Sequence, residues 1–349
     1  MRRKNSLRSL LCAVLLLTSL WAMQRLLMPK YMATSRDGAL IGEYYHSGFD
    51  HDVVFIGDCE VYENFSPVTL WENYGISSYI RGSAQQTIWQ SYYLLEETLR
   101  YERPKVVVFN VLAMQYDSPE STGSGEKREA YNRMTLDGMR WSRSKWQAVQ
   151  ASMTEEELRW HSTYTYLFPL LRFHDRWSQL TKEDFTYFLR REPISYNGYL
   201  MHTGVRPMTA QHAEPKPINL DFGPNSYAYL DRIRQLCSEH GVQLVLIKAP
   251  SQSPIWWPEW EAQICAYAET YKLPYVNFIP LSEEIGLDWQ RDTYDTGLHL
   301  NVSGAEKLSL YFGAMLQEQY GLPDHRGEQE YDNYWTPLCT RYQREKQGG

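Results

Sequence analysis

The sequence predicts an α/β protein, a three-layer α/β/α sandwich in which helices cover both faces of a sheet of about five parallel strands. Five runs rich in Val, Ile, Phe and Tyr are nearly continuous in apolar residues, as strands buried on both faces are; they lie at 52–57, 76–82, 105–111, 242–249 and 275–279. Helical patterns follow or separate them at 87–102, 226–241, 258–273 and 305–321. This alternation implies right-handed crossovers and hence the three layers.

Residues 118–224 interrupt the alternation of strands and helices. The interruption begins with a polar Gly/Ser-rich loop and continues as several helices rich in Trp, Tyr and His. We expect a helical insertion between the third and fourth strands that caps one edge of the sheet. The predicted organisation is a basic start with a membrane anchor at 1–30, an α/β domain at 31–322 that includes the insertion, and a C-terminal tail at 323–349 without a clear period, frayed at its end.

The first 30 residues contain six basic side chains, no acidic one, and an apolar run. From Leu10 to Met28 this run has 19 residues, close to the roughly 20 that span a bilayer. No small-x-small site precedes Gln24, which favours an uncleaved single-pass anchor over a cleaved signal that would release a secreted body. The preceding basic residues predict a cytoplasmic N-terminus and an extracytoplasmic body in the cell membrane.

The rest of the chain carries 29 basic and 42 acidic residues, a net charge of -13. Such a body repels nucleic acid, which excludes it as a partner. Without a Gly-rich phosphate loop or nucleotide motif, we predict no cofactor. The four cysteines of the body lack metal-ligand spacing, so we predict no metal site. Two of them, Cys237 and Cys265, either pair or remain half-buried thiols.

Two segments bring reactive residues to the carboxyl edge of the predicted sheet, where ligands bind in open parallel sheets. In FIGDCEVYENFSP, Cys59 follows the first strand, and in DTYDTGLHLNVSGAEKLS, His299 precedes the last helix. A thiol in the first turn of a helix gains from unpaired N–H groups, and an imidazole accepts its proton. Asp58 and Glu60 favour a protonated thiol unless they point away or engage cations.

The GDCE segment resembles the GDS motif of SGNH/GDSL hydrolases, with Cys59 in the place of their nucleophilic serine. DTGLHLNVSGAEK is similar to their late Asp-x-x-His block, and the order of the pieces matches over most of residues 50–320. The resemblance implies an SGNH/flavodoxin-like fold. The whole chain looks like the N-terminally anchored, extracytoplasmic SGNH-like proteins of Gram-positive bacteria, with alginate O-acetyltransferase domains as more distant relatives.

The same resemblance implies a carboxylate that holds His299. The family places this acid three residues before the histidine, whereas Asp295 lies four before it and Asp292 seven before it. We favour Asp295, with Gly297 absorbing the extra residue in the loop. The alternative is that either acid only caps a turn.

An oxyanion hole is also implied, made in the family by the N–H of the nucleophile, a glycine after the second strand and an asparagine after the third. Gly82 and Asn110 are the corresponding residues. Asn110 lacks the Gly-x-Asn-Asp context of the family, and its alternative role is a satisfied amide of the core.

The insertion offers four further candidates for holding an anionic or polyhydroxyl substrate: Asn132, Arg133, His174 and Arg176. Taken together, these features imply an esterase or O-acyltransferase that acts on a cell-envelope polysaccharide or polymer through Cys59, with an acyl-donor membrane protein as a candidate partner. The alternative is a non-catalytic relative, a scaffold or glycan-binding component of an envelope assembly.

Overall fold

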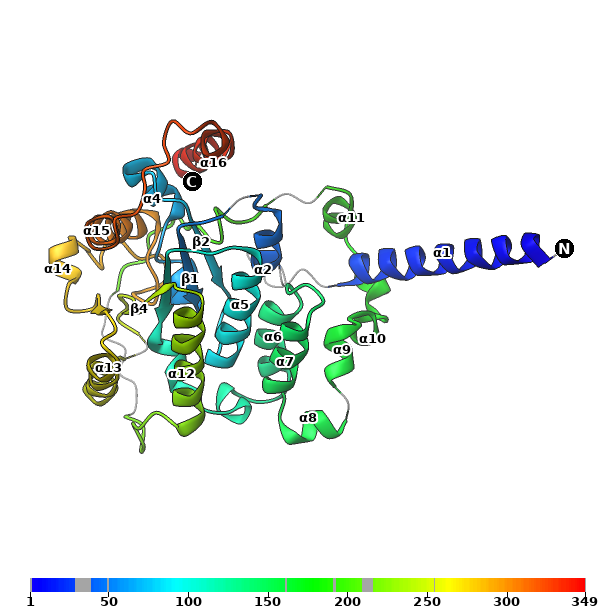
Figure 1. The fold of residues 1–349 in the computed structure, drawn as a ribbon, viewed down its shortest axis with the longest axis horizontal. Coiled ribbons are helices and arrows are strands. Elements are labelled where there is room, and N and C mark those ends of the chain that lie inside the picture. The colour runs from blue at the N-terminus through cyan, green and yellow to red at the C-terminus, as the bar shows by residue number, and fades with distance from the viewer. Residues whose placement is uncertain are drawn as a thin grey trace.

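A computed structural model describes residues 2–28, 39–48, 50–160, 162–190, 193–208, 216–253 and 255–348 (Figure 1). Its five strands form one parallel sheet in the order β2-β1-β3-β4-β5. Each predicted run contains one of them: β1 (Val53–Gly57), β2 (Ser78–Gly82), β3 (Val106–Asn110), β4 (Gln243–Lys248) and β5 (Tyr275–Asn277). The predicted fold class is confirmed. The expected boundary between anchor and domain, at residues 30 and 31, lies outside the described residues.

Alternating strand residues divide the core into two halves, one on each face of the sheet. Val54, Ile56 and Val107 pack toward α5 (Ile88–Tyr101), α12 (Pro224–Glu239) and α13 (Pro258–Tyr271). Val53 and Phe55 face the other way, toward α3 (Cys59–Tyr62), α4 (Pro67–Tyr74), α15 (Val302–Tyr320) and α16 (Gln329–Gly348). In the view of Figure 1, α4, α15 and α16 lie above the sheet and α12 and α13 below it.

The remaining elements are short except for α1 (Arg2–Leu27). They are α2 (Ala39–Glu43), η1 (Tyr44–His46), η2 (Val111–Gln115), η3 (Pro119–Thr122), α6 (Gly125–Leu136), α7 (Arg143–Ala151), α8 (Glu155–Arg159), α9 (Thr163–Leu167), α10 (Leu170–Phe173), η4 (Arg176–Gln179), α11 (Lys182–Leu189) and α14 (Ser282–Ile285). Those from η3 to α11 belong to the predicted insertion, which follows β3 and precedes α12 and β4.

The C-terminal tail is a helix, α16, although its sequence showed no clear period. Trp335 is fully buried and stacks on Trp71 of α4, with ring centroids 5.1 Å apart and planes 7° apart. Tyr342, further along α16, is also buried and donates a hydrogen bond to Glu306 of α15 (3.0 Å). Because only one narrow side of α16 contacts the body, its apolar pattern in the sequence is weak.

The end of the insertion lies along the open edge of β2. Ile80 N donates to the carbonyl oxygen of Asn197 (2.9 Å), and the Asn197 side chain donates to the carbonyl of Ser78 (3.1 Å). Gly198 adopts φ +84°, and a Cβ there would come within 1.9 Å of the Ile80 carbonyl oxygen. The chain thus covers an edge strand that would otherwise present unpaired backbone groups.

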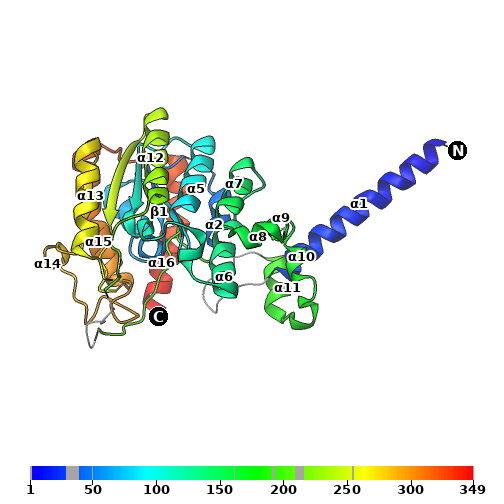
Figure 2. The same cartoon turned by 90° about the horizontal axis from the view of Figure 1, so that it is seen from below.

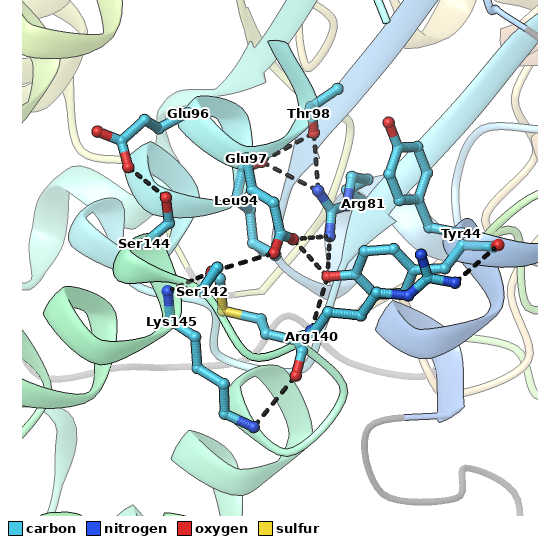
Figure 3. Close-up of polar contacts among 12 residues, drawn as sticks. Tyr44, Arg81, Leu94, Glu96, Glu97, Thr98, Arg140, Ser142, Ser144 and Lys145 are labelled. Atoms are coloured by element: carbon cyan, nitrogen blue, oxygen red, sulfur yellow. Dashed lines mark hydrogen bonds and ion pairs between the residues drawn. The ribbon is translucent and has the colours of Figure 1, made fainter. Parts of the chain in front are cut away.

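A buried arginine of β2 ties the sheet to helix α5 (Figure 3). Arg81 is fully buried and pairs with Glu97 (2.9 Å), and it also donates to Thr98 Oγ1 (2.8 Å) and the Leu94 carbonyl (3.0 Å). Its guanidinium carbon lies 4.1 Å from the ring centroid of Tyr44, a cation–π contact.

The same network reaches the insertion. The Tyr45 hydroxyl donates to Glu97 and accepts from Arg140 N (3.0 Å), while Arg140 Nη2 donates to the Tyr45 carbonyl (3.2 Å). Ser142 Oγ donates to the other oxygen of Glu97 (3.4 Å). One buried acid therefore connects β2, α5, the segment after α2 and the loop before α7, and so fixes the insertion on the α/β domain.

Helix α1 extends away from the body and joins it beside α10 and α11 (Figures 1 and 2). Its segment Ser6–Leu27, 22 residues with a mean hydropathy of 1.8, is long and apolar enough to cross a membrane. The side chains of residues 6–20 are exposed, whereas Leu27 is buried against the body. A single N-terminal apolar helix of this kind is compatible with a signal anchor or a signal sequence.

The pair between Arg81 and Glu97 predicts a large loss of stability on removal of one partner. Glu97→Ala leaves a buried, unpaired guanidinium, and we expect the free energy of unfolding to fall by about 3 kcal/mol. Denaturant unfolding of the full chain in detergent micelles measures it. Arg100→Ala on the same helix breaks an exposed pair with Glu96 and should cost less than about 1 kcal/mol. Equal losses in the two variants would contradict the structural role of the Arg81 network.

Candidate active site

Cys59 is the first residue of α3, immediately after the turn that ends β1. Asp58 caps the helix: its side chain accepts a hydrogen bond from Glu60 N (3.2 Å). The turn has no room for a side chain at Gly57, because a Cβ there would lie 2.5 Å from Val61 Cγ2 and 3.0 Å from Asn110 Cβ. Cys59 is partly exposed as a residue, and the N–H groups that follow it are engaged, because Val61 N donates to the Asp58 carbonyl (3.0 Å) as Glu60 N does to the Asp58 side chain.

The His299 loop is held by α15. Asn301 caps that helix by accepting from Ser303 N (3.1 Å) and Gly304 N (3.3 Å), and its amide also donates to the carbonyls of Gly204 and Arg291. This cap fixes the start of α15 at Val302, shortly after His299 in the chain.

Asp295 holds both ends of His299. One carboxylate oxygen accepts from the backbone His299 N (2.8 Å), and the other contacts Nδ1 of the imidazole (2.6 Å). The four-residue spacing fits because Thr296 (φ +67°) and Gly297 (φ +93°) are both left-handed. Gly297 tolerates this conformation, whereas the β-branched Thr296 is strained in it. The extra residue of the loop is therefore absorbed at two positions, of which the sequence indicated one.

The side chains of Cys59 and His299, which are 240 positions apart in the sequence, lie close enough together for the charge of the imidazole and a hydrogen bond from it to favour the thiolate. Because Nδ1 faces Asp295, the nitrogen left for the thiol is Nε2. The side chains of His299 and Asp295 are 16% and 19% exposed, so the three residues form an accessible chain of thiol, imidazole and carboxylate. These are the three residues that the sequence nominated for catalysis.

Glu63 is a second carboxylate on the same imidazole, and sequence reasoning missed it. Its Oε2 lies 3.0 Å from His299 Nδ1 and accepts from the Tyr294 hydroxyl (2.6 Å), while Oε1 lies 3.7 Å from His202 Nε2. Tyr294 stacks on His202 with ring centroids 3.8 Å apart. Glu63 follows Cys59 by four residues, and only the fold shows that it faces a loop more than 200 residues later.

Asn64 fastens the two halves of the site together, and it too was missed. Its amide nitrogen donates to the Pro250 carbonyl (3.1 Å) after β4, and its amide oxygen accepts from Leu300 N (2.8 Å), next to His299. The side chain is fully buried. It therefore joins the cysteine helix, the end of β4 and the histidine loop.

Two acidic neighbours of the thiol are engaged inside the protein. Glu60 forms a fully buried pair with Lys248 (2.8 Å) and accepts from Ser251 Oγ (2.7 Å). Asp58 accepts from the Asn110 amide (3.0 Å). Burial and the nearby Glu60 charge raise the pKa of Asp58 to about 7. The lysine thus compensates Glu60, and the negative charge beside Cys59 is smaller than the sequence suggested.

Opposing effects set the charge of the thiol and the imidazole. Burial raises the pKa of Cys59, and the charge of His299 counters this only in part. Burial lowers the pKa of His299, but the charges of Cys59 and Glu63 and the Asp295 hydrogen bond outweigh it and hold that pKa well above the usual value. The thiol of Cys59 is therefore harder to ionise than an ordinary cysteine, and the imidazole of His299, which contacts two carboxylates, is easier to protonate than an ordinary histidine.

The remaining sequence candidates near the strand ends differ in their environments. Gly82 pairs in register with Gly57, and a Cβ on it would lie 3.1 Å from the Gly57 carbonyl oxygen and 3.2 Å from Tyr62. The amide nitrogen of Asn110 donates to Asp58 and Glu60 (3.0 Å each), and its oxygen accepts from Ala249 N (3.2 Å). Its donors thus point at carboxylates, as the core-amide alternative requires.

Asp292, the alternative acid, pairs with Lys307 (2.6 Å) and accepts from Asp288 N (2.8 Å), so its carboxylate supports the base of the loop. It is 1% exposed.

The four insertion candidates make structural contacts away from this constellation. Asn132 accepts from Gln90 (2.8 Å) and donates to the Ser152 carbonyl. Arg133 is buried and pairs with Glu129 and Asp137, and His174 Nδ1 contacts the Leu171 carbonyl (3.2 Å). Arg176 pairs with Asp184 and donates to the carbonyls of Leu27 and Met28 at the end of α1. Their partners lie in the insertion, in α5 and in α1, so the structure does not bring them to Cys59.

Glu63, Asp295 and His299 place ligand atoms within 4.8 Å of one another, a spacing that a metal ion accepts. The shared atom, His299 Nδ1, already bonds both carboxylates. We therefore interpret the cluster as a hydrogen-bonded one.

Cys237, which is buried, and Cys265, which is exposed, are free thiols. A cavity of about 560 Å³ lies elsewhere, between Arg25, Glu43 and Arg341.

Comparison with known proteins gives weak structural matches. No family model and no curated protein matches the chain. An acylhydrolase candidate from Bacteroides fragilis aligns with a TM-score of 0.38 and 12% identity, covering 80% of this chain and 95% of its own. A GDSL-like lipase from Bacteroides thetaiotaomicron aligns with a TM-score of 0.35 and 12% identity, covering 76% and 88%. At these scores the functional case rests on the geometry of the site.

The raised pKa of Cys59 predicts slow alkylation at neutral pH. The rate of carbamidomethylation of Cys59 by iodoacetamide should rise with pH, with a midpoint above the value of about 8.5 for an ordinary thiol. His299→Gln should move the midpoint still higher, because it removes the cation that favours the thiolate. Peptide mass spectrometry at several pH values measures both. A midpoint below 7 in the unaltered chain would show a preformed thiolate and refute this charge assignment.

Glu63 predicts a pH-dependent contribution to stability. Burial opposes its ionisation, but His299, His202 and Tyr294 together lower its pKa from 4.5 to about 2. Above pH 4.5 the ionised Glu63 therefore adds about 3 kcal/mol to the free energy of unfolding. This contribution is lost as the pH falls toward 2. Unfolding of Glu63→Gln and the unaltered chain should therefore differ most at pH 6 and less at pH 3. A difference that is constant with pH would contradict the ion-pair role.

Proposed function

We propose that this chain is an acyl-transfer enzyme, an esterase or O-acyltransferase that forms a thioester on Cys59. The observation that carries the proposal is the contact of Cys59 with His299, whose other nitrogen is held by Asp295. A nucleophile, a base and an orienting carboxylate in sequence-distant segments are the arrangement that acyl transfer requires.

In the proposed first half-reaction, Nε2 of neutral His299 takes the thiol proton while Sγ attacks the carbonyl carbon of an ester. The C–O bond breaks, and the leaving alcohol takes the proton from His299. Water or an acceptor hydroxyl then gives its proton to His299 and attacks the thioester; the C–S bond breaks, and the departing sulfur takes that proton from His299 to restore the thiol. We assign the N–H groups of Cys59 and Gly82 to the developing oxyanion. Asn110 holds Asp58 and Glu60 in place.

The substrate that we propose is an ester-bearing polysaccharide or polymer of the cell envelope. Helix α1 is the anchor in this proposal, and the basic start of the chain would keep the N-terminus in the cytoplasm and the body outside. An anchored body reaches surface polymers without diffusing away. An O-acyltransferase of this type needs an acyl donor on the outer side, which a membrane protein would supply.

The proposal predicts the effects of three substitutions on ester turnover. With p-nitrophenyl acetate, Cys59→Ala should abolish turnover, and His299→Gln should lower kcat by about 10²–10⁴-fold because the proton acceptor is lost. Cys265→Ala, which removes an exposed thiol of α13, is the matched control and should leave kcat unchanged. Turnover that is equal in the Cys59→Ala and Cys265→Ala variants would refute the proposal.

A second candidate function is a non-catalytic scaffold or glycan-binding component of an envelope assembly. The raised pKa of Cys59 and the engaged amide of Asn110 favour it, because each weakens a part of the catalytic apparatus. In this case Cys59→Ala and His299→Gln leave the cellular phenotype intact. Substitutions in the insertion alter it.

A further inference from the structure

Exposed large apolar side chains gather in one part of the body. Outside α1, fourteen such side chains are described, and eight of them lie between residues 158 and 189, on or directly beside α8 to α11: Leu158, Trp160, Tyr164, Phe168, Leu171, Trp177, Phe185 and Leu189. Trp160 is 78% exposed, Trp177 71% and Leu189 81%. We call this set the apolar rim. Single exposed apolar residues are ordinary, whereas a concentration of this kind marks an interaction surface.

The part of the apolar rim on α10 and α11 lies at the point where α1 leaves the body. Helix α1 contacts α10 and α11, and both views show these helices at its base (Figures 1 and 2). Trp21 of α1 lies 6.4 Å from the ring of Phe188 on α11. Arg176 donates to the carbonyls of Leu27 (3.0 Å) and Met28 (3.1 Å), and its other nitrogen pairs with Asp184 (2.9 Å). The last turn of α1 is therefore capped by the insertion itself.

We propose that the apolar rim docks on the lipid bilayer, in the interface of the outer leaflet around α1. The proposal rests on the anchoring by α1 proposed above. A helix that crosses the bilayer brings whatever surrounds its exit point to the lipid headgroups. Trp and Tyr are the residues that favour this zone, because their rings are apolar and their N–H and O–H groups remain hydrated. The Trp, Tyr, Phe and Leu side chains of the apolar rim match that chemistry.

Apolar contact drives the docking, not charge. Residues 155–190 contain five basic and six acidic side chains. A nearly neutral surface gains little from anionic lipids. Docking should therefore be almost the same on phosphatidylcholine and on phosphatidylglycerol vesicles and should change little with salt, unlike the binding of a polybasic segment.

Docking would give the reactive site a fixed direction. The Arg81–Glu97 network holds the insertion on the α/β domain. Helix α15, whose first turn follows His299, lies at the opposite end of the body from α1 in both views (Figures 1 and 2). With the apolar rim in the headgroups, this end points away from the bilayer. The site then faces polymers of the envelope and not the membrane lipids.

Lipid quenching of fluorophores on the full chain in proteoliposomes tests the proposal. A small fluorophore is attached by click chemistry to p-azidophenylalanine at one of three positions: Phe185 in the apolar rim, Tyr271 as an exposed control on α13, and Leu15 in α1. Doxyl-labelled phosphatidylcholine should quench the probes at 185 and 15 strongly and leave the probe at 271 unquenched. Quenching at 15 without quenching at 185 overturns the docking and keeps the anchor, which leaves a protein partner for the apolar rim. Absence of quenching at 15 refutes the anchor itself.

A matched pair of variants adds a quantitative result. With the probe at 185, Trp160→Ser together with Trp177→Ser should shift the equilibrium toward the undocked body by about tenfold per tryptophan. Both residues are highly exposed, so folding should be retained. Tyr101→Ser with Tyr271→Ser removes exposed aromatics elsewhere and should change nothing. Equal quenching at 185 in both double variants overturns the assignment of the apolar rim.

Discussion

The buried ion pair of Glu60 and Lys248 fixes where Cys59 stands. It joins the first turn after β1 to the end of β4, with both charges removed from water. Such a pair adds little net stability, because desolvation costs about as much as the attraction returns, but an unpaired partner would be costly. The pair therefore acts as a positional constraint. Asn110 and Ser251 also donate hydrogen bonds to Glu60. Cys59 lies one residue before Glu60 on the same helical turn, so the pair fixes the position of the thiol as well.

A second constraint acts on His299. Two carboxylates, from Asp295 in its own loop and from Glu63 beyond the cysteine helix, contact one imidazole nitrogen. Asp295 sets the orientation of the ring through the backbone and the side chain together. Glu63 adds charge and connects the ring to Tyr294 and His202. Two acids stabilise the imidazolium more than one, so the pair of Cys59 and His299 is expected to become reactive only as the pH rises.

Periodicity was sufficient to predict the sheet. The strands, the large helices and the position of the insertion followed from apolar runs, because parallel strands buried on both faces leave an unmistakable pattern. Helix α16 did not, since two large aromatic side chains, Trp335 and Tyr342, provide most of its burial among polar residues. The early and late motifs located Cys59, Asp295 and His299. These three residues could be recognised because the residues around each of them resemble a known motif.

Residues without such a context were harder to assign. Glu63 and Asn64 contact a loop more than 200 positions away, and no local pattern shows such a partner. Arg133 and Arg176 are ordinary basic residues of amphipathic helices in the sequence. In the fold, one is buried with two acids and the other caps α1. The sequence shows which residue types are present in the insertion, whereas only the tertiary contacts show how each charge is used.

If Cys59 carries an acyl group during turnover, mass spectrometry detects that group on the peptide that contains Cys59. The full chain is incubated with p-nitrophenyl acetate at pH 9, quenched in acid and digested, and the masses of its peptides are measured. We expect one added acetyl group on the peptide that contains Cys59, released by hydroxylamine and absent in Cys59→Ala. An acetyl group found only on other residues, or an unmodified Cys59 while ester is being consumed, would contradict it.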